Sequence, residues 1–463
     1  MSLDPAPGRR NSPLMGRERW RLGRLLELWD HLVDPKVGIV RAIAEFPIDD
    51  DDPNFFHYLS RACDASPFTG VRNFGYNGGV STVRHVAVAK AIGEAVERYC
   101  GAIYDRRSLT YASYAELGHL ATNPDDYALY RTDQLNQDSF PCKPFTANTT
   151  VAWTAGRSLI TGAPVLVPAA MVYVPYHFSK SRSEPPITQS ISTGLACGCS
   201  VAEAMLSGLC EAVERDAFTL TWQARMSRPR ISHESLPGAV RDRLERFAKV
   251  RLRVEIMDIS TDIRIPAILM VAIGDSPTSP AFAVATAADP CPETALIKCI
   301  EELAHTRKFA KHLMMTAPEV PIQAAEAHPA VVGQDDHVRF YCSPAARPFI
   351  EFCWASPQMG AFSDLPRGAS AGGELSAEAK LQAAVAELAR CGLEPVVCDL
   401  TTPDVRALGL SVVRVVVPGL HPLFMGYRAR ALGGRRLYTV PQVLGSTALD
   451  PAGPDNHYPH PFP

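Results

Sequence analysis

The chain has 463 residues, of which 46% are hydrophobic and 21% are charged, and its formal net charge is -3. This composition is typical of a globular protein with a large core, and the nearly neutral charge argues against a general binder of nucleic acid or of membrane surfaces. No apolar run approaches the ~20 residues that span a bilayer, and the polar start lacks the apolar segment of a secretory signal, so we expect a cytoplasmic protein.

The first predicted helix covers residues 20–32. Its apolar side chains recur at helical spacing along one face, with Trp20, Leu25 and Trp29 among them. Such a stripe either packs against the helix's own domain or forms a docking surface for a partner, and the spacing alone leaves both open.

An acidic run, Asp49–Asp52, is followed by Pro53 and predicts a solvated loop. A loop of this kind suits a boundary between an N-terminal segment and a main domain. We therefore expect a helical extension over residues 1–64 and a main domain over residues 65–463.

Helical and β-rich segments alternate after residue 70. This alternation predicts an α+β fold with mixed sheets, because helical and strand patterns succeed one another without a solenoid-like repeat. The last helix and the last two strands predict a βαβ-like ending before a proline-rich tail. Helices are predicted over residues 84–101, 200–222, 291–313 and 376–391, a hairpin over residues 150–174, and strands over residues 251–260, 265–273, 281–288, 395–400 and 412–420.

The twelve cysteines include no CxxC pair, and the closest two are Cys197 and Cys199. Ligands of a structural zinc ion usually come in pairs two to four residues apart. The spacing therefore predicts reduced thiols in a cytosol rather than a zinc site.

The pentapeptide EAVER occurs twice, at Glu94–Arg98 and at Glu211–Arg215, each time within a predicted helix. At about 100° per residue, the two glutamates and the arginine of the first copy share one helix face. In the second helix Glu203 joins the two glutamates on their face, and the arginine lies at its edge.

A solvated helix face tolerates almost any polar residue, so exposed Glu–Arg pairs do not explain why a five-residue string recurs. Buried acids become tolerable where a hard cation binds them, because Mg²⁺ takes carboxylate oxygens, and arginines complement phosphates as bidentate donors. A third predicted helix adds a further polar set, namely Glu301, Glu302, His305 and Arg307. Since the sequence has no P-loop, a nucleotide site here would be built from helix faces.

These segments resemble the YcaO family. The stretch STGLACGCSVAEAMLSGLCEAVERDAFTLTW resembles its central signature, KAIGEAVERYCG its first ExxER motif, and ALIKCIEELAHTRK its third motif. The resemblance covers about residues 65–463 and implies the YcaO fold with an ATP and Mg²⁺ site on these helices. It implies that Glu94, Glu97, Glu211, Glu214 and Glu302 hold the metal and that Lys90, Arg98, Glu203, Arg215 and Glu302 contact ATP.

Three positions depart from the family's pattern. Lys90 stands where Ser is frequent, Cys199 where Asn is frequent, and His305 where the third motif usually has Gln. Each departure changes one expected nucleotide or metal contact, and Lys90 is a candidate for a phosphate contact of its own.

The chain ends in NHYPHPFP, in which Pro459, Pro461 and Pro463 form a PxPxP end. Alone, such a stiff segment is typical of a disordered terminus or of an SH3-type ligand. Beside the YcaO motifs it resembles the tail of azoline-forming cyclodehydratases, in which the tail reaches the active site and assists catalysis. His457 and His460 are predicted to be solvent-exposed loop residues.

The resemblance implies heterocyclisation of Cys, Ser or Thr in a ribosomal precursor peptide. The side chain adds to the preceding amide carbonyl, the oxyanion takes the γ-phosphate of ATP, and loss of phosphate leaves a thiazoline or oxazoline. The terminal carboxylate or His305 is the candidate that accepts the proton. The rival outcomes are thioamide or amidine formation and a catalytically inactive scaffold that binds a peptide or a partner.

Enzymes of this type usually act with a domain or protein that binds the leader of the precursor peptide. The first 64 residues are too few for such a domain. We therefore expect a stand-alone cyclodehydratase that works with an E1-like (ThiF-like) partner protein and, on the family resemblance alone, forms a homodimer.

Overall fold

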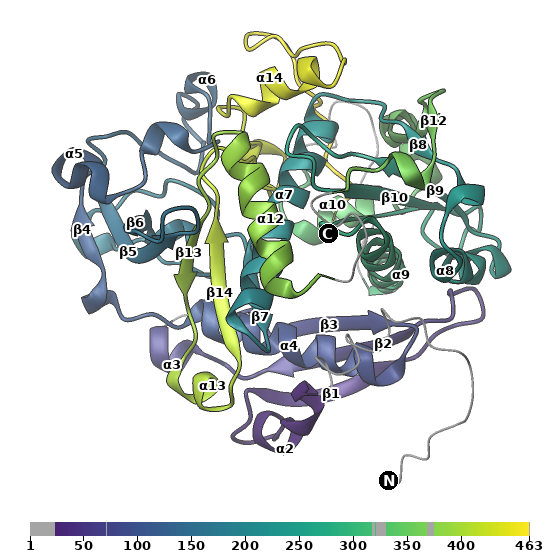
Figure 1. Ribbon diagram of the computed structural model, residues 1–463, viewed down its shortest axis with the longest axis horizontal. Coiled ribbons are helices and arrows are strands. Elements are labelled where there is room, and N and C mark those ends of the chain that lie inside the picture. Colours follow the sequence, from purple (N-terminus) through teal and green to yellow (C-terminus); the bar gives the residue numbers. More distant parts are fainter. Residues whose placement is uncertain (1–23, 71, 317–319, 321–329, 368–374, 463) are drawn as a thin grey trace.

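The structure is a computed structural model that describes residues 24–70, 72–316, 320, 330–367 and 375–462 (Figure 1). Its architecture is α+β, as predicted, and the described strands form three sheets. Every described helix is too short or too polar to cross a bilayer.

The N-terminal sheet consists of three antiparallel strands, β1 (Val40–Phe46), β2 (Phe56–Ala62) and β3 (Tyr76–Ser81). Two of these strands fall in the segment that was expected to be helical, so the sequence analysis missed them. Their polar and apolar residues follow no clean period, and they are held in place by pairing with each other and by the pairing of β2 with β3. The division between residues 64 and 65 stays a prediction.

Two larger sheets make up the rest of the β structure. The second sheet has the order β11–β10–β9–β8–β12, and the third has the order β4–β5–β13–β14–β7 with β6 paired to β5. Their strands are β4 (Thr110–Ala112), β5 (Val151–Ser158), β6 (Pro164–Pro168), β7 (Leu195–Gly198), β8 (Arg230–Ile231), β9 (Arg253–Asp258), β10 (Ala267–Ile273), β11 (Phe282–Ala288), β12 (Met359–Gly360), β13 (Val396–Asp399) and β14 (Ser411–Val416). The predicted hairpin is confirmed, because β5 and β6 pair antiparallel.

The βαβ-like ending that the sequence predicted is wrong, because β13 and β14 run antiparallel. The connection between them contains only the short helix α13 (Pro403–Ala407). A parallel crossover needs about a dozen residues or more, and residues 400–410 are too few to return the chain to the same end of the sheet.

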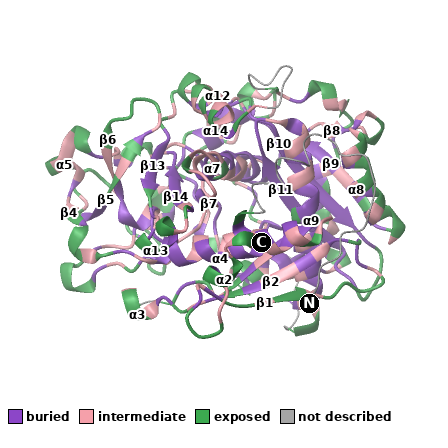
Figure 2. Ribbon diagram, turned by 60° about the horizontal axis from the view of Figure 1, so that its bottom comes forward, coloured by how far each residue is buried: buried purple, intermediate pink, exposed green. Residues whose placement is uncertain are grey.

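Three long helices carry the predicted motifs: α4 (Arg84–Ala102), α7 (Val201–Gln223) and α9 (Pro292–Thr316). Helix α7 packs against both larger sheets, and Figure 2 shows it between their strands. Because it is covered on several sides, apolar residues are buried around most of its circumference. The other described helices are α2 (Trp29–Leu32), α3 (Ser66–Thr69), α5 (Tyr114–Leu117), α6 (Thr132–Leu135), α8 (Gly238–Lys249), α10 (Gln334–Phe340), α11 (Arg347–Ile350), α12 (Ala377–Arg390) and α14 (Arg436–Val443).

Two adjacent glycines allow β3 to approach helices on both faces of its sheet. A Cβ on Gly79 would collide with the carbonyl oxygen of Ala87 in α4, and a Cβ on Gly78 would collide with the His305 ring of α9. Successive strand residues point to opposite faces. The N-terminal sheet is therefore held between α4 and α9.

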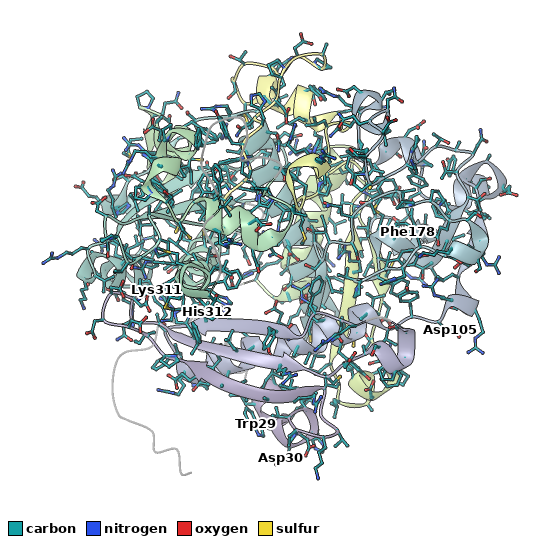
Figure 3. All side chains as sticks on the ribbon, turned by 180° about the vertical axis from the view of Figure 1, so that it is seen from behind. Trp29, Asp30, Asp105, Phe178, Lys311 and His312 are labelled. Atoms are coloured by element: carbon teal, nitrogen blue, oxygen red, sulfur yellow. The ribbon has the colours of Figure 1, made fainter. Side chains whose placement is uncertain are left out.

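The described part of the N-terminal segment packs on its own domain. Residues 24–27 and α2 are helical, and Leu25 and Leu32 are buried in a cluster with residues of α4. Trp29 is 36% exposed and lies at the edge of the molecule (Figure 3). Trp20 lies outside the described residues.

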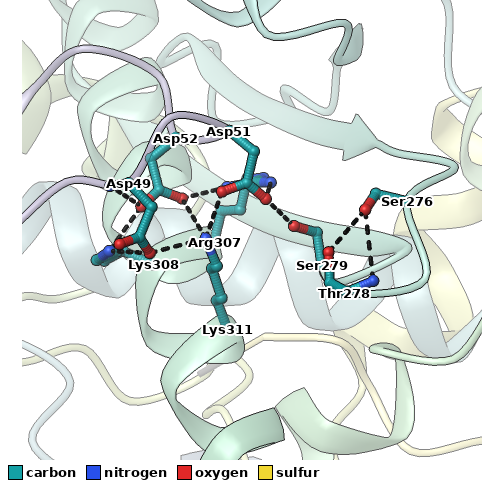
Figure 4. A network of polar contacts seen from close by, with 9 residues as sticks. All are labelled: Asp49, Asp51, Asp52, Ser276, Thr278, Ser279, Arg307, Lys308 and Lys311. Carbon is teal, nitrogen blue, oxygen red and sulfur yellow. Dashed lines mark hydrogen bonds and ion pairs between the residues drawn. The ribbon is translucent and has the colours of Figure 1, made fainter.

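The loop between β1 and β2 is ion-paired to α9, which corrects the expectation of a solvated loop at Asp51 and Asp52, whereas Asp49 and Asp50 are exposed as expected. The Arg307 guanidinium and the Lys308 ammonium each lie 2.6 Å from an oxygen of Asp52, whose side chain is 2% exposed (Figure 4). Lys311 pairs with the neighbouring aspartates. Three cations thus neutralise three carboxylates and tie the N-terminal sheet to the helix that carries the third motif.

Replacing Asp52 by alanine is expected to lower the free energy of unfolding by about 3 kcal/mol, because it leaves the Arg307 guanidinium buried without its closest anion. Urea denaturation followed by circular dichroism measures the change. The control is Asp399→Asn, which breaks an exposed pair with Arg406 and is expected to cost less than about 1 kcal/mol. Equal stability of the two variants would contradict the structural role of the network.

Candidate functional site

A cavity of about 700 Å³ is lined by residues of α4, α7, α9 and β3. It brings together most of the residues predicted from the sequence, which come from three separate helices. The predicted residues that line it are Lys90, Glu94, Glu97, Arg98, Glu211, Glu214, Arg215, Glu302 and His305.

The first EAVER copy forms a compact hydrogen-bonded unit on α4. The Gly78 N–H donates to Glu94 Oε2 over 2.7 Å, and Arg98 Nη2 donates to Glu94 Oε1 over 3.1 Å. Arg98 Nη1 lies 3.6 Å from Glu97 Oε1. Both glutamates therefore face the same guanidinium.

The second copy repeats these contacts on α7. The Gly194 N–H donates to Glu211 Oε2 over 3.0 Å, and Arg215 Nη2 donates to Glu211 Oε1 over 3.1 Å. Arg215 Nη1 lies 3.4 Å from Glu214 Oε1. The repeated string is thus a repeated structure: in each copy, a glycine that precedes the helix and an arginine one turn on hold the first glutamate.

Burial of these carboxyl groups raises their pKa values. Burial, together with the nearby Glu211 and Glu94 charges, raises the pKa of Glu97 to about 8. Burial likewise raises the pKa of Glu214 to about 7, although Arg215 and a 2.7 Å hydrogen bond from the Thr286 hydroxyl favour its charged form. Without a cation, Glu97 and part of the Glu214 population therefore hold protons at neutral pH.

Binding of Mg²⁺ should therefore release protons and gain strength as the pH rises. Because the pKa values of Glu97 and Glu214 are raised in the fold, their protonation stabilises the ligand-free protein. This contribution to stability is fully present below the ordinary glutamate pKa of 4.5 and is lost as the pH rises through about 7 to about 8. We expect Mg²⁺ to raise the melting temperature more at about pH 8.5 than at about pH 6. Differential scanning fluorimetry measures both, and an equal gain at the two pH values would contradict the assignment.

The third motif contributes differently from the expectation. Glu301, not only Glu302, belongs to the site: its buried carboxylate accepts from Lys90 Nζ over 2.6 Å and from the Ser81 hydroxyl over 2.9 Å. The Lys90 ammonium is thus paired with an acid beside the cavity. Arg307, expected with this set, instead pairs with Asp52 away from the cavity.

Glu203 does not line the cavity with the other acids. Its N–H donates to the Ser200 hydroxyl over 3.2 Å, and its carboxylate accepts from the Cys199 N–H over 3.2 Å. The side chain therefore caps the first turn of α7. Its predicted ATP contact stays a prediction.

The C-terminal tail is packed into the core beside the site. The Tyr341 hydroxyl donates to the Pro459 carbonyl over 2.6 Å, and Pro461 is buried. The Arg215 guanidinium lies over the Phe462 ring, 4.1 Å from its centroid. Phe462 lines the large cavity, whereas Pro463 lies outside the described residues.

Both tail histidines were expected to be solvent-exposed. This is confirmed for His457 but wrong for His460, which is buried. The His460 ring stacks on His337 of α10, with their centroids 3.9 Å apart. Burial lowers the pKa of both imidazoles, that of His337 to about 4. Both rings are therefore neutral at physiological pH and belong to the packing of the tail.

Arg414 of β14 is a buried cation that the sequence analysis missed and that interacts with the charges of the site without lining the cavity. It is 6% exposed, and its Nε and Nη1 atoms have no hydrogen-bond partner among the described residues. Burial lowers its pKa to about 10, against the nearby Glu211 charge that raises it. A single arginine inside the apolar run VVRVVV was the signal that could have found it.

The donor set of the cavity fits a divalent cation and a triphosphate. Glu94, Glu97, Glu211 and Glu214 all line the cavity, and they supply the carboxylate oxygens that Mg²⁺ prefers. Arg98 Nη1 and Arg215 Nη1 are buried without a hydrogen-bond partner among the described residues, so each has a donor to give to phosphate oxygens.

Comparison with known proteins also indicates a site for ATP and Mg²⁺. A family model described as YcaO cyclodehydratase, ATP- and Mg²⁺-binding, matches residues 79–421. A protein of the tfuA 3′ region of Rhizobium leguminosarum bv. trifolii is 29% identical over 304 residues, or 63% of this chain and 65% of that protein. An uncharacterized protein of Methanothermobacter thermautotrophicus is 26% identical over 366 residues, or 76% of this chain and 85% of that protein.

Solved structures share the fold. A heterocyclase in complex with substrate and cofactor matches 96% of this chain and 57% of its own, with a TM-score of 0.76 and 24% identity. The heterocyclase TruD matches 82% of this chain and 52% of its own, with a TM-score of 0.61 and 26% identity. YcaO from Methanopyrus kandleri, bound with AMPPCP and Mg²⁺, matches 88% of this chain and 91% of its own, with a TM-score of 0.61 and 21% identity. The chain thus spans just over half of the two heterocyclase chains and less than two thirds of the Rhizobium protein.

Proposed function

The chain belongs to the YcaO family, whose cofactors are ATP and Mg²⁺, and from this premise we propose that it is an ATP-dependent cyclodehydratase that acts on a ribosomal precursor peptide. Its product would carry thiazoline or oxazoline rings made from Cys, Ser or Thr. The observation that carries the proposal is the tail, whose Phe462 ring lies 4.1 Å from the Arg215 guanidinium at the edge of the cavity.

The side chains of the cavity suit this reaction. Glu94, Glu97, Glu211 and Glu214 would hold Mg²⁺, which when bound neutralises the charge of the transferred phosphoryl group. Arg98 and Arg215 would bind phosphate oxygens through their Nη1 atoms, which are ion-paired to glutamates but make no hydrogen bond among the described residues.

Proton transfer also has a candidate. The attacking thiol or hydroxyl must lose a proton as it adds to the amide carbonyl. His305 lines the cavity against Gly78 and is the side chain we assign to that task, with the terminal carboxylate of Pro463 as the alternative acceptor.

We further propose a separate E1-like protein that binds the leader of the precursor peptide, a homodimeric enzyme and a cytoplasmic location. One neighbour of the same fold, the E. coli microcin synthetase McbBCD, is a complex of several proteins and has also been solved with pro-MccB17 bound.

The test combines the purified protein with a Cys-rich precursor peptide and a candidate E1-like leader-binding protein. We expect each modified residue to lose the mass of one water while one ATP is converted to ADP and phosphate. ATP hydrolysis with a sulfur-for-oxygen exchange in the peptide would replace the proposal by thioamide formation. Peptide binding without ATP hydrolysis would replace it by a scaffold role.

A further inference from the structure

A second cavity, of about 220 Å³, adjoins the large one. The two cavities share the Glu94–Arg98 pair and the Glu211–Arg215 pair. The outer walls of the small cavity are two loops, residues 191–193 and residues 423–425, together with Phe74. The two Glu–Arg pairs, together with Tyr76 and Gln334, thus line both spaces.

The two loops are tied to each other. The Gln189 side-chain amide donates to the Met425 carbonyl over 2.7 Å, and the Met425 N–H donates back to Gln189 Oε1 over 3.0 Å. Behind the first loop, Arg414 Nη2 donates to the Ile191 carbonyl over 2.7 Å. The small cavity is therefore preformed rather than a gap between loose segments.

The tail holds the second loop from its other side. His460 Nε2 donates to the Phe424 carbonyl over 2.7 Å, and the Gly426 N–H donates to His337 Nε2 over 2.9 Å. His337 Nδ1 in turn donates to the His460 carbonyl over 2.9 Å. Docking of the tail and the shape of the small cavity are thus parts of one hydrogen-bonded unit.

The size and lining of the small cavity identify its occupant. At about 220 Å³ it lies below the roughly 300–1,000 Å³ of cofactor pockets, whereas the large cavity lies within that range. Ser192 and Thr193 offer hydroxyl groups, and Leu423 and Met425 offer apolar surface. Such a lining suits a short extended peptide, which presents backbone amides and small side chains.

We propose that the small cavity is the subsite for the backbone amide of the substrate peptide, with the nucleotide in the large cavity. This inference rests on the proposed function, because ATP-dependent amide activation requires an amide oxygen and a terminal phosphate to meet. An amide held in the small cavity and a phosphate held in the large one would meet at the residues that line both cavities. Arg98 and Arg215 are among these residues and can stabilise the charge that passes to phosphate.

Met425→Trp tests the assignment by filling the small cavity. We expect kcat/KM for the precursor peptide to fall by about 10²-fold, since displaced substrate loses its reactive geometry, while affinity for AMPPCP with Mg²⁺ stays unchanged. The matched control is Met359→Trp, at an exposed position of β12, which should behave as wild type. Met425→Leu keeps the volume and should retain activity, and the unchanged affinity for AMPPCP with Mg²⁺ excludes misfolding of Met425→Trp as the cause.

A cross-linking experiment separates this inference from the proposed function. The probe is the precursor peptide with a benzoylphenylalanine in place of its first modified residue, irradiated with the wild-type protein, its partner, AMPPCP and Mg²⁺. We expect adducts within residues 191–193 or 423–425, whichever product the enzyme makes. Adducts mapping elsewhere, or full activity of Met425→Trp, overturn the subsite, whereas adducts at the loops with a thioamide product overturn only the proposed function.

Discussion

The Glu211→Gln variant is expected to modify its peptide about 10²–10³-fold more slowly than the wild type, as is usual when one preorganised charged group of an active site is lost. The amide keeps an oxygen but loses the negative charge that attracts Mg²⁺. Its NH₂ group would also face the Gly194 N–H or the Arg215 guanidinium, both of which are donors to the native carboxylate. Phosphate release and peptide mass, followed over a Mg²⁺ titration, measure the loss.

The control for this variant is Glu245→Gln, an exposed glutamate of α8, which should leave the rate unchanged. Glu94→Gln supplies a sharper comparison. Because Glu94 and Glu211 make the same contacts in the two EAVER copies, the two losses should be of similar size. A full rate for either variant would show that its copy does not take part in catalysis.

Deleting residues 461–463 is expected to slow peptide modification by about 10²-fold while nucleotide affinity changes little, because misplaced catalytic groups cost this much. The deletion removes the Phe462 ring from the Arg215 guanidinium and from Phe218, whose ring centroid lies 5.1 Å away. It also removes the Phe462 N–H that donates to His460 Nδ1 over 3.2 Å. The Arg215 guanidinium would then no longer be covered by an aromatic ring. The His460 imidazole would lose one of the hydrogen bonds that orient it.

Rates of azoline formation and titration of AMPPCP with Mg²⁺ measure the two quantities separately. His457→Ala is the control, because this histidine belongs to the tail but is exposed. Phe462→Ala isolates the ring from the rest of the deletion and should account for part of the loss. An unchanged rate after the deletion would remove the tail from the reaction and leave it a structural role alone.

The ion network between the N-terminal sheet and α9 has a consequence for the site. Arg307, Lys308 and Lys311 lie on the same helix as Glu302 and His305, and they are anchored by Asp49, Asp51 and Asp52. Burial would raise the pKa of Asp51, but hydrogen bonds from Lys311 and Ser279 hold it at about 2. Asp51 therefore stays charged at physiological pH, and the ion pairs hold α9 against the loop between β1 and β2.

The helices of the site and their acids were within reach of the sequence. The small and apolar residues of α4, α7 and α9 recur with helical spacing, and the repeated EAVER string marks two equivalent turns. These are local signals, since a helix face is set by residues three or four positions apart. The predicted helices follow from them, whereas the strands β9, β10 and β11 follow from their β-branched and apolar runs. The family was indicated by the resemblance of three whole motifs.

Only the tertiary structure decided which of these residues meet. Contacts between residues far apart in the chain placed Arg414 near Glu211 and drew Asp52 into a buried ion pair. They also buried His460, which its sequence neighbours made look exposed. The sequence determined what each helix face carries, but burial depends on what covers that face, and that is settled by packing between segments hundreds of residues apart.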